Sequence, residues 1–382
     1  MSGALLLAWL AASSVWAGVN ENGGTVSAPV LQIPVGARAV SLGTAFTAVA
    51  DDVSTLFYNP AGLTSVHHRE ATMMFLNGTE LQATNFFAGA SPLPFSGLSG
   101  SGFATLGASL LSSSNGNVDV TTLKPDGSSG GTRTIDAGGD TVLTLGYAER
   151  IADTPFETKD STMHFDHYFG ASGKYVRSTL AEDYHAQTYA ADIGYLGRAP
   201  ELGVSLGAAI VNLGGKLRYV ETADPLPLAM RVGGAYQFAM PQTHFLQWSL
   251  DGQYEYYEKL WFVNTGVEYT FLKSFSTRVG YQVHKALSGL TMGFGARWKN
   301  WAIDYAWAFN DNQGDAHRFS FTFRFGAVPV REREKARRPF MESVPDKEEL
   351  PERGDEKPST YDQPARPRRS APDVQGAPGW IY

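Results

Sequence analysis

The chain contains no cysteine and few charged residues. It has 382 residues, and Asp, Glu, Lys and Arg make up 18% of them, against about 25% in an ordinary soluble domain. The absence of cysteine excludes disulfide scaffolds, thiolate zinc sites, iron–sulfur clusters and thiol nucleophiles. The formal net charge of −7 argues against nucleic-acid binding, which normally needs a basic surface.

Long apolar runs are also missing. After residue 18 no stretch of 18 apolar residues occurs, so the sequence predicts no transmembrane helix. The start of the chain differs, because residues 5–10 are an apolar run and Val15-Trp16-Ala17 precedes Gly18 in the manner of a cleavage site. We therefore expect residues 1–17 to be a secretory signal peptide.

The charges gather at the C-terminal end of the chain. Residues 327–382 hold 11 basic residues, 11 acidic residues and 9 of the 20 prolines. A segment of this composition cannot bury a core, so we expect a disordered tail. The rest of the chain is then poorer still in charge, although aromatic residues make up 12% of the whole. Such a composition is unusual for a protein dissolved in water.

What the sequence does contain is strict alternation of apolar and polar residues. From 318 to 325 every second residue is Phe, and the residues between them are Arg, Ser, Thr and Arg. The alternating segments run for about ten residues, which a tilted membrane-spanning strand needs, whereas strands of soluble sandwiches commonly have about five or six. Strands in lipid must close, because open edges would leave backbone groups unpaired. We therefore predict an all-β fold, a transmembrane antiparallel β-barrel in the bacterial outer membrane, at residues 67–326.

Fourteen strands are expected in this barrel. They lie near 67–77, 81–91, 101–112, 139–150, 164–177, 184–196, 202–212, 229–238, 244–256, 260–270, 275–284, 288–298, 301–310 and 316–325. An even number places both barrel ends, and with them the tail, in the periplasm. Of the outer connections only 113–138 and 213–228 are long, and the first is mostly polar. Several late strands turn Gly and Ala inward, which leaves room in the lumen for residues 18–66.

This N-terminal segment carries the most specific motif. We expect it to form a compact hatch, in which Ser54 or Asp52 caps a short helix that ends near Asn59-Pro60. The adjacent Asp51 and Asp52 could act as an acid/base pair, but we favour the interpretation that they form hydrogen bonds within the hatch or pair with Arg38. The motif residues are Gly36, Arg38, Leu42, Gly43, Asp51, Asp52, Asn59, Pro60 and Gly62.

These residues resemble the hatch motif of the FadL-like outer-membrane barrel superfamily, and more closely its PorV/PorQ-type branch. Further motifs of that branch have similar counterparts downstream, namely Asn212-Leu213-Gly214, Pro225-Leu226-Pro227, Arg231-Val232-Gly233-Gly234-Ala235-Tyr236 and Arg278-Val279-Gly280-Tyr281. The tail after Gly326 departs from the branch, whose chains end soon after the last strand.

The resemblance implies one of two functions. PorV-type members bind secreted cargo in type IX secretion, and the outer-loop contacts would here include Asn212, Gly214, Pro225 and Pro227. FadL-type members pass long-chain fatty acids and other hydrophobic compounds inward. The polar 113–138 loop and the downstream motifs favour the PorV type, with FadL-like transport as the alternative.

Chemistry beyond binding finds no support in the sequence. No Ser, His and acid set and no metal-ligand spacing stands out, so we expect no catalytic residue, no metal and no cofactor. The expected partners are outer-membrane lipid together with either secreted cargo and secretion-system proteins or a hydrophobic ligand, and no nucleic acid.

Overall fold

The computed structural model describes residues 24–77, 83–100, 103–125, 127–157, 162–181, 184–240, 243–283, 289–309 and 315–326. The expected signal peptide at 1–17 and the expected tail at 327–382 lie outside these residues.

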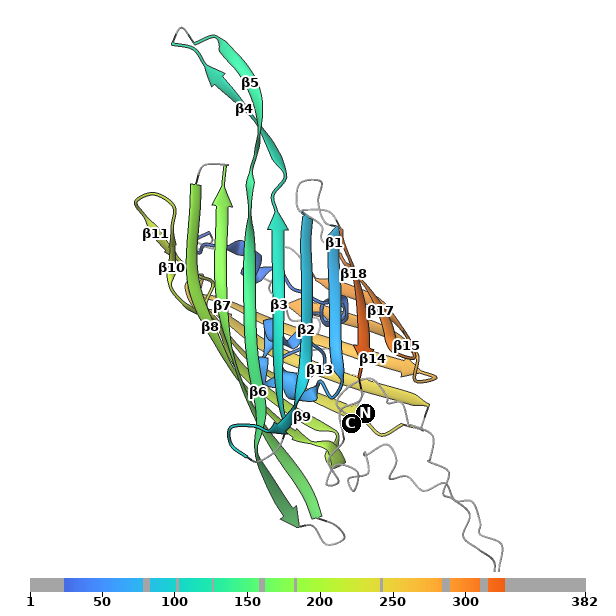
Figure 1. Cartoon of the computed structure of the whole chain (residues 1–382). Coiled ribbons are helices and arrows are strands. Elements are labelled where there is room, and N and C mark those ends of the chain that lie inside the picture. The colour runs from blue at the N-terminus through green and yellow to red at the C-terminus, as the bar shows by residue number, and fades with distance from the viewer. Residues whose placement is uncertain are drawn as a thin grey trace, which may run out of the picture.

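Fourteen antiparallel strands form a closed barrel (Figure 1). They are β1 (Arg69–Asn77), β2 (Ala83–Ser96), β3 (Phe103–Ser114), β6 (Gly138–Glu157), β7 (Thr162–Leu180), β8 (Tyr184–Ala199), β9 (Val204–Gly214), β12 (Ala229–Phe238), β13 (His244–Glu255), β14 (Leu260–Phe271), β15 (Phe275–Val283), β16 (Leu290–Trp298), β17 (Trp301–Ala308) and β18 (Ala316–Phe325). The first and last strands pair along their whole length, from Arg69↔Phe325 to Asn77↔His317. The wall therefore has no unpaired edge, as a lipid environment requires.

The fourteen strands predicted from alternation are all present, and two of them, 229–238 and 316–325, have the predicted bounds. The largest difference concerns β6, which extends seven residues beyond its predicted end at 150, while β7 begins two residues before its predicted start at 164. In this extension of β6 almost every residue is exposed, so inside and outside no longer alternate. The sequence signal stops where the strand leaves the wall, although its backbone pairing with β7 continues.

The outer face of the wall is apolar, and the inner face is polar. Leu145, Val232 and Phe294 are 61%, 64% and 62% exposed, while the residues next to them in sequence point inward. Trp261 and Trp298 lie at strand ends and are also largely exposed, as in the aromatic girdles of membrane barrels. This distribution is typical of a transmembrane β-barrel.

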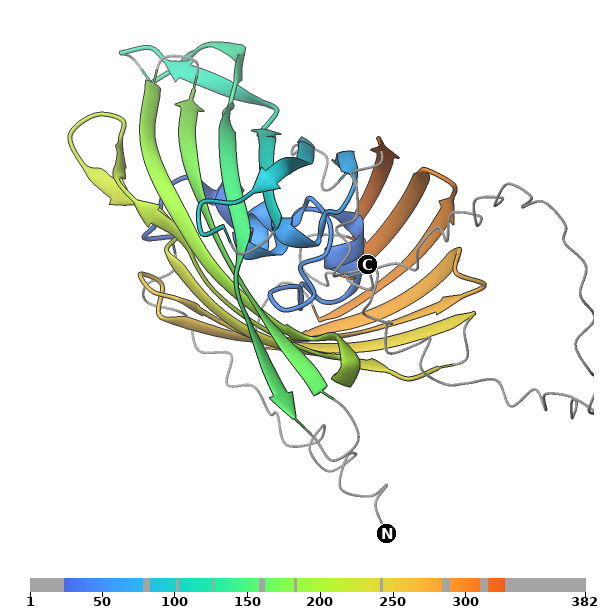
Figure 2. The same ribbon diagram turned by 60° about the horizontal axis from the view of Figure 1, so that its bottom comes forward.

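The segment before β1 lies inside the ring of strands (Figure 2). It contains η1 (Pro29–Gln32), α2 (Ala37–Ser41), α3 (Thr55–Tyr58) and η2 (Pro60–Ser65). Every residue from 35 to 66 is buried except Gly36 and Asp52, which are half-buried. We call residues 35–66 the plug and residues 24–34 the strap. The molecule thus has its core between the plug and the inner wall.

Each of the two long connections forms a small strand pair that the sequence analysis did not predict. β4 (Asn117–Leu123) pairs with β5 (Ser129–Asp136), and β10 (Lys216–Arg218) pairs with β11 (Ala223–Pro225). A short turn, η3 (Pro200–Leu202), joins β8 to β9. We call the β4–β5 pair the ribbon. It projects beyond the barrel at the end opposite the one where β1 begins and β18 ends (Figure 1). We call these two ends the outer and the inner end, after the predicted orientation.

Candidate functional site

The plug rests on a ring of glycines that face the lumen. On nine of the barrel strands a Cβ added to one glycine would lie within 3.2 Å of a plug atom. These glycines are Gly107, Gly146, Gly170, Gly194, Gly207, Gly233, Gly266, Gly280 and Gly293. The plug atoms that they approach belong to residues 41–63. The prediction that inward small residues make room for the N-terminal segment is therefore confirmed, and the ring extends well beyond the late strands.

Backbone approaches backbone in this ring. A Cβ on Gly280 would lie 2.0 Å from the Gly43 amide nitrogen, and one on Gly207 would lie 2.2 Å from the Thr47 carbonyl oxygen. Neighbouring wall side chains bond to the plug backbone, since Asp251 accepts a hydrogen bond from the Thr47 amide at 2.7 Å. The fit therefore depends on the absence of side chains at the glycines and on polar side chains beside them.

Arg38 is the electrostatic centre of the plug. It bonds to Asp51 through two nitrogens, and its Nη1 lies 3.5 Å from an Asp52 oxygen. Its Nε also donates to Glu268 of β14 at 2.8 Å. The expected pairing of Arg38 with the two aspartates is confirmed, and the arginine in addition joins the plug to the wall. These carboxylates raise the pKa of Arg38 against the opposing effect of burial, so its charge is fixed.

The charge network continues through the wall. Arg278 of β15 donates to Glu268 at 2.5 Å and to Asp304 of β17 at 2.7 Å. On the neighbouring strands β18 and β1, Arg324 donates to Glu70 at 2.7 Å, and Glu70 accepts a hydrogen bond from the Val53 amide at 3.0 Å. Sequence reasoning missed these wall residues as members of the site. Their signal was a charged residue at an inward position of an alternating strand.

Asp52 belongs to the plug, at the start of the turn before α3. Its Oδ1 accepts a hydrogen bond from the Ser54 amide at 2.9 Å and another from the Ser54 hydroxyl. Ser54 itself occupies the N-cap position but makes no capping bond with its side chain. Of the two residues predicted to cap the helix, only Asp52 thus accepts a hydrogen bond from a backbone amide. Burial is the main cause that raises the pKa of the Asp52 carboxyl to about 6, and Arg38 opposes it.

This shift predicts a pH-dependent stability of the plug. Because the pKa of Asp52 in the folded chain exceeds its ordinary 3.8, the fold favours the protonated form, and this contribution is lost as the pH rises from about 4 to about 6. We expect Asp52→Asn, which cannot ionise, to have a higher thermal midpoint than the wild type at pH 7.5 but not at pH 4. If the two thermal midpoints differed by the same amount at pH 7.5 and at pH 4, the raised pKa of Asp52 would be contradicted.

Asn59 holds the plug together and ties it to β8. Its side-chain amide donates to the carbonyls of Thr47 at 2.9 Å and Tyr195 at 3.0 Å. The Oδ1 atom of the same side chain accepts a hydrogen bond from the Ala61 amide at 3.2 Å and so caps η2. The predicted end of the helix at Asn59-Pro60 agrees with α3, which ends at Tyr58.

The other motif residues serve the same close packing. Gly36 and Gly43 have φ angles of 78° and 63°, which favour glycine. A Cβ on Gly62 would lie 2.2 Å from the Thr55 hydroxyl. Leu42 is buried against Gly266 and Pro60 against Gly170. All nine predicted hatch residues therefore lie in the plug or at its contact with the wall.

The four predicted outer-loop contacts lie at the outer end but differ in exposure. Asn212 is 4% exposed, has a φ of 63°, accepts from Lys174 at 2.6 Å and donates to the Pro227 carbonyl at 3.0 Å. Pro227 is also buried, Pro225 is half-buried, and Gly214 is exposed. Asn212 and Pro227 thus hold the outer connection to the barrel and offer no surface to a partner.

The strap closes the outer mouth together with this connection. The Ser27 amide donates to the Pro225 carbonyl at 2.8 Å. Gln32 donates to Glu258 at 2.7 Å and to Glu255 at 3.2 Å. The lumen is therefore covered at its mouth by the strap and filled below it by the plug.

The ribbon has two unlike faces. Thr121 bonds to Thr132 across the strands at 3.0 Å, and Thr134 donates to Asp119 at 2.6 Å, so these residues share a polar face. By alternation, Val118 and Val120 lie on the other face, and they are 46% and 40% exposed. The ribbon thus presents β-branched apolar residues outside the barrel.

Among the residues that the structure describes, no group of three His, Asp or Glu side chains could hold a metal ion. Within the same residues, no helix is long and apolar enough to cross a membrane.

Comparisons with known proteins give distant likenesses. Residues 10–85 match the model of an uncharacterised protein family, UPF0164, and no curated protein matches the chain in sequence. Among solved structures, the toluene transporter TbuX of Ralstonia pickettii has a TM-score of 0.42 and 13% identity over 76% of this chain and 98% of its own. The toluene transporter TodX of Pseudomonas putida has a TM-score of 0.45 and 11% identity, over 75% and 96%. A FadL homologue from Pseudomonas aeruginosa has a TM-score of 0.38 and 12% identity, over 75% and 96%. At these scores the likeness carries no conclusion about what this chain does.

Proposed function

We propose that this chain is an outer-membrane barrel that stays shut and binds partner proteins at its outer end. The observation that carries the proposal is the contrast between the two parts of the molecule. The plug is buried almost throughout, whereas the ribbon stands free beyond the rim with Val118 and Val120 exposed (Figure 1).

The lumen offers little room for a ligand in this state. Two cavities in the described part of the molecule have volumes of about 30 and 10 Å³, whereas pockets for drug-sized ligands have about 300–1,000 Å³. A hydrophobic compound could cross only after the plug had moved. A binding role at the outer end needs no such movement.

The partners that we propose are secreted proteins in a type IX-like pathway. The resemblance of the hatch and downstream motifs to the PorV type supports this choice. We propose further that the outer end faces the cell surface and that the inner end, with residues 327–382, faces the periplasm, an orientation that an even number of strands supports.

Replacing residues 117–136 by an Asn-Gly turn tests the role of the ribbon. We expect the shortened barrel to keep its heat-dependent shift on a gel, because the ribbon pairs only with itself. We expect its recovery of secreted proteins in pull-downs to fall at least about tenfold, which corresponds to about 1.4 kcal/mol. Lys273→Ser, in an exposed turn at the inner end, serves as the control. Undiminished recovery by the shortened barrel would contradict a role for the ribbon.

Transport of hydrophobic compounds is the second candidate. The observation in its favour is that the plug is held by ion pairs and hydrogen bonds, which can break and form again. Slow oleate uptake in a deletion strain whose secretion is normal would favour transport. Retention of secreted proteins in the periplasm of the deletion strain, with normal oleate uptake, would favour the binding role.

A further inference from the structure

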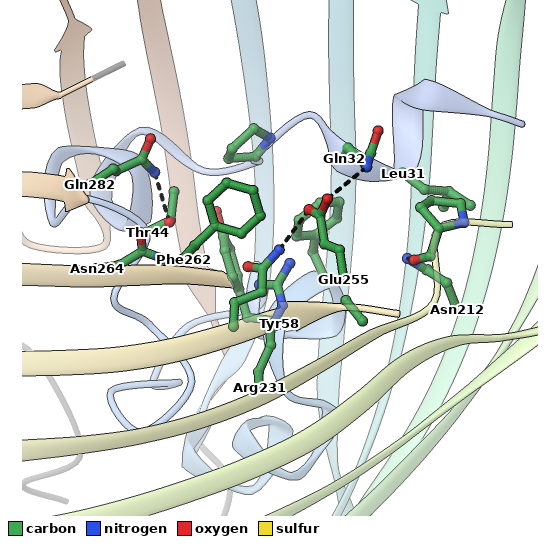
Figure 3. Close-up of a pocket in the computed structure, with 15 residues that line it drawn as sticks. Leu31, Gln32, Thr44, Tyr58, Asn212, Arg231, Glu255, Phe262, Asn264 and Gln282 are labelled. Carbon is green, nitrogen blue, oxygen red and sulfur yellow. Dashed lines mark hydrogen bonds between the residues drawn. The ribbon is translucent and has the colours of Figure 1, made fainter. Parts of the chain in front are cut away.

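Two basic residues on the outer surface of the barrel differ from the basic residues inside it. Inside, basic side chains lie near carboxylates, and Arg231, for example, lines the same cavity as Glu255 (Figure 3). On the surface, Arg69 at the start of β1 and Lys299 in the turn between β16 and β17 are exposed. Neither of them forms an ion pair with the residues that the structure describes. Their charges are therefore open to a group outside the chain.

Arg69 and Lys299 lie at the same level of the wall, at the inner end. β17, β18 and β1 are neighbours in the barrel, and Arg69 lies opposite Phe325. The Arg324 amide donates to the Asn300 carbonyl at 2.8 Å, which places the turn that contains Lys299 beside the end of β18. The two cations thus flank Phe325, with their backbones about two strand spacings, or about 10 Å, apart.

The surface between the two cations is aromatic. Trp301 lies opposite Phe323 with the ring centroids 4.1 Å apart, and Phe323 stacks on Phe325 at 5.6 Å. Nζ of Lys299 lies 5.1 Å from the ring centroid of the exposed Trp298. Aromatic residues of this kind lie at the level of the lipid headgroups. The two cations therefore reach the phosphates of the leaflet at the inner end.

No carboxylate of the neighbouring strands competes for these cations. β16, β17, β18 and β1 contain only two acidic residues, Asp304 and Glu70. Asp304 pairs with Arg278 at 2.7 Å, as described above. Glu70 is 3% exposed and pairs with Arg324 at 2.7 Å. The lipid-facing surface of these four strands thus carries no negative charge.

We propose that Arg69 and Lys299 bind the headgroup of one anionic phospholipid in the leaflet at the inner end, with its phosphate between the two cations. Its acyl chains lie against Phe323 and against the exposed Ala71, which is opposite Phe323 on β1. A zwitterionic headgroup brings a cation of its own to the same place, so an anionic headgroup fits better. This proposal is independent of the partner at the outer end.

The lipid preference of the purified full chain tests the site. Native mass spectrometry counts the bound dioleoyl phosphatidylglycerol or dioleoyl phosphatidylcholine during a titration in a nonionic detergent. Each basic side chain near an anionic headgroup strengthens binding about fivefold. We therefore expect the first phosphatidylglycerol to bind at least about tenfold more tightly than the first phosphatidylcholine. Equal affinities would overturn the proposal.

Two lysines in similar turns provide a matched pair of variants. Lys299 and Lys259 are both exposed and have φ angles of 53° and 54°, which asparagine tolerates, but Lys259 lies at the outer end. Lys299→Asn should reduce the preference for phosphatidylglycerol about fivefold, and the addition of Arg69→Ser should abolish it. Lys259→Asn should retain it. An equal loss in both single lysine variants, or an undiminished preference in the double variant, would overturn the proposal.

Photolabelling provides a readout that needs no variant. Phosphatidylglycerol with a diazirine in its headgroup should label the wild-type chain at the inner ends of β1, β17 and β18 and at the turn that contains Lys299. Labelling confined to other strands would place the anionic lipid elsewhere and so overturn the proposal.

Discussion

Gly170→Val should unseat the plug, whereas Gly173→Val on the same strand should leave it in place. A Cβ at Gly170 would lie 2.4 Å from the Ala61 amide nitrogen and 2.4 Å from the Pro60 carbonyl carbon, while a Cβ at Gly173 meets nothing within 4 Å. Rotation of a side chain cannot relieve a clash with backbone. We therefore expect a loss of stability at or above the upper end of the about 1–3 kcal/mol that is typical of overpacking.

Antibiotic sensitivity gives the readout in cells. A large hydrophilic antibiotic such as vancomycin should inhibit cells with Gly170→Val at a lower concentration than wild-type cells, and the purified variant should unfold at a lower temperature. Cells with Gly173→Val should behave as the wild type. If cells with either variant are equally resistant to vancomycin and both variants unfold at the same temperature, the glycine ring does not seat the plug.

Arg38→Met should have the second large effect. It leaves the buried carboxylate of Asp51 without its cation, and it leaves Glu268 with Arg278 as its remaining ion-pair partner. Breaking a buried pair by the removal of one partner typically costs about 3–5 kcal/mol, because a charge stays buried without compensation. We expect a loss of this size in the free energy of unfolding, and partial release of the plug.

A double variant separates loss of charge from loss of shape. Arg38→Met with Asp51→Leu removes both members of one pair, so its loss should be smaller than the sum of the single losses. Arg177→Met provides a control for the removal of an exposed arginine. Additive losses would mean that Arg38 and Asp51 are not coupled, and the plug would then depend mainly on the glycine ring.

The two effects act on the same interface by different means. The glycines let the plug approach the wall, and the charge network sets its position once it is there. The network includes Arg38 and Asp51 from the plug and Glu268 and Arg278 from the wall. An ion pair tolerates only one register between its partners, whereas apolar contact alone would allow sliding. The plug is therefore both sealed and fixed in orientation.

The proposed site could be predicted only in part. The motif run from Gly36 to Gly62 identified the plug side, because small residues, one Arg and two Asp in a short segment indicate a compact polar interior. The wall side was missed at Glu268, Arg278 and Asp251. Each is an inward residue of an ordinary alternating strand, and no local pattern tells which plug residue will lie opposite it. The ribbon was missed because its strands pair only with each other and lie outside the apolar band.

The sequence by itself determined the barrel. Alternation with a period of two fixes which face of each strand meets lipid, closure follows because lipid satisfies no backbone group, and the strand count follows from the number of alternating segments. The tertiary structure alone decided how the lumen is filled. The contact of Gly280 with Gly43 and the pairing of Arg38 with Glu268 join residues more than 200 positions apart, and such pairs arise from the closure of the ring and the register of its strands. The low charge content of the chain thus reflects a wall that faces lipid, while charged side chains that point inward from that wall, such as Glu268 and Asp251, hold the plug.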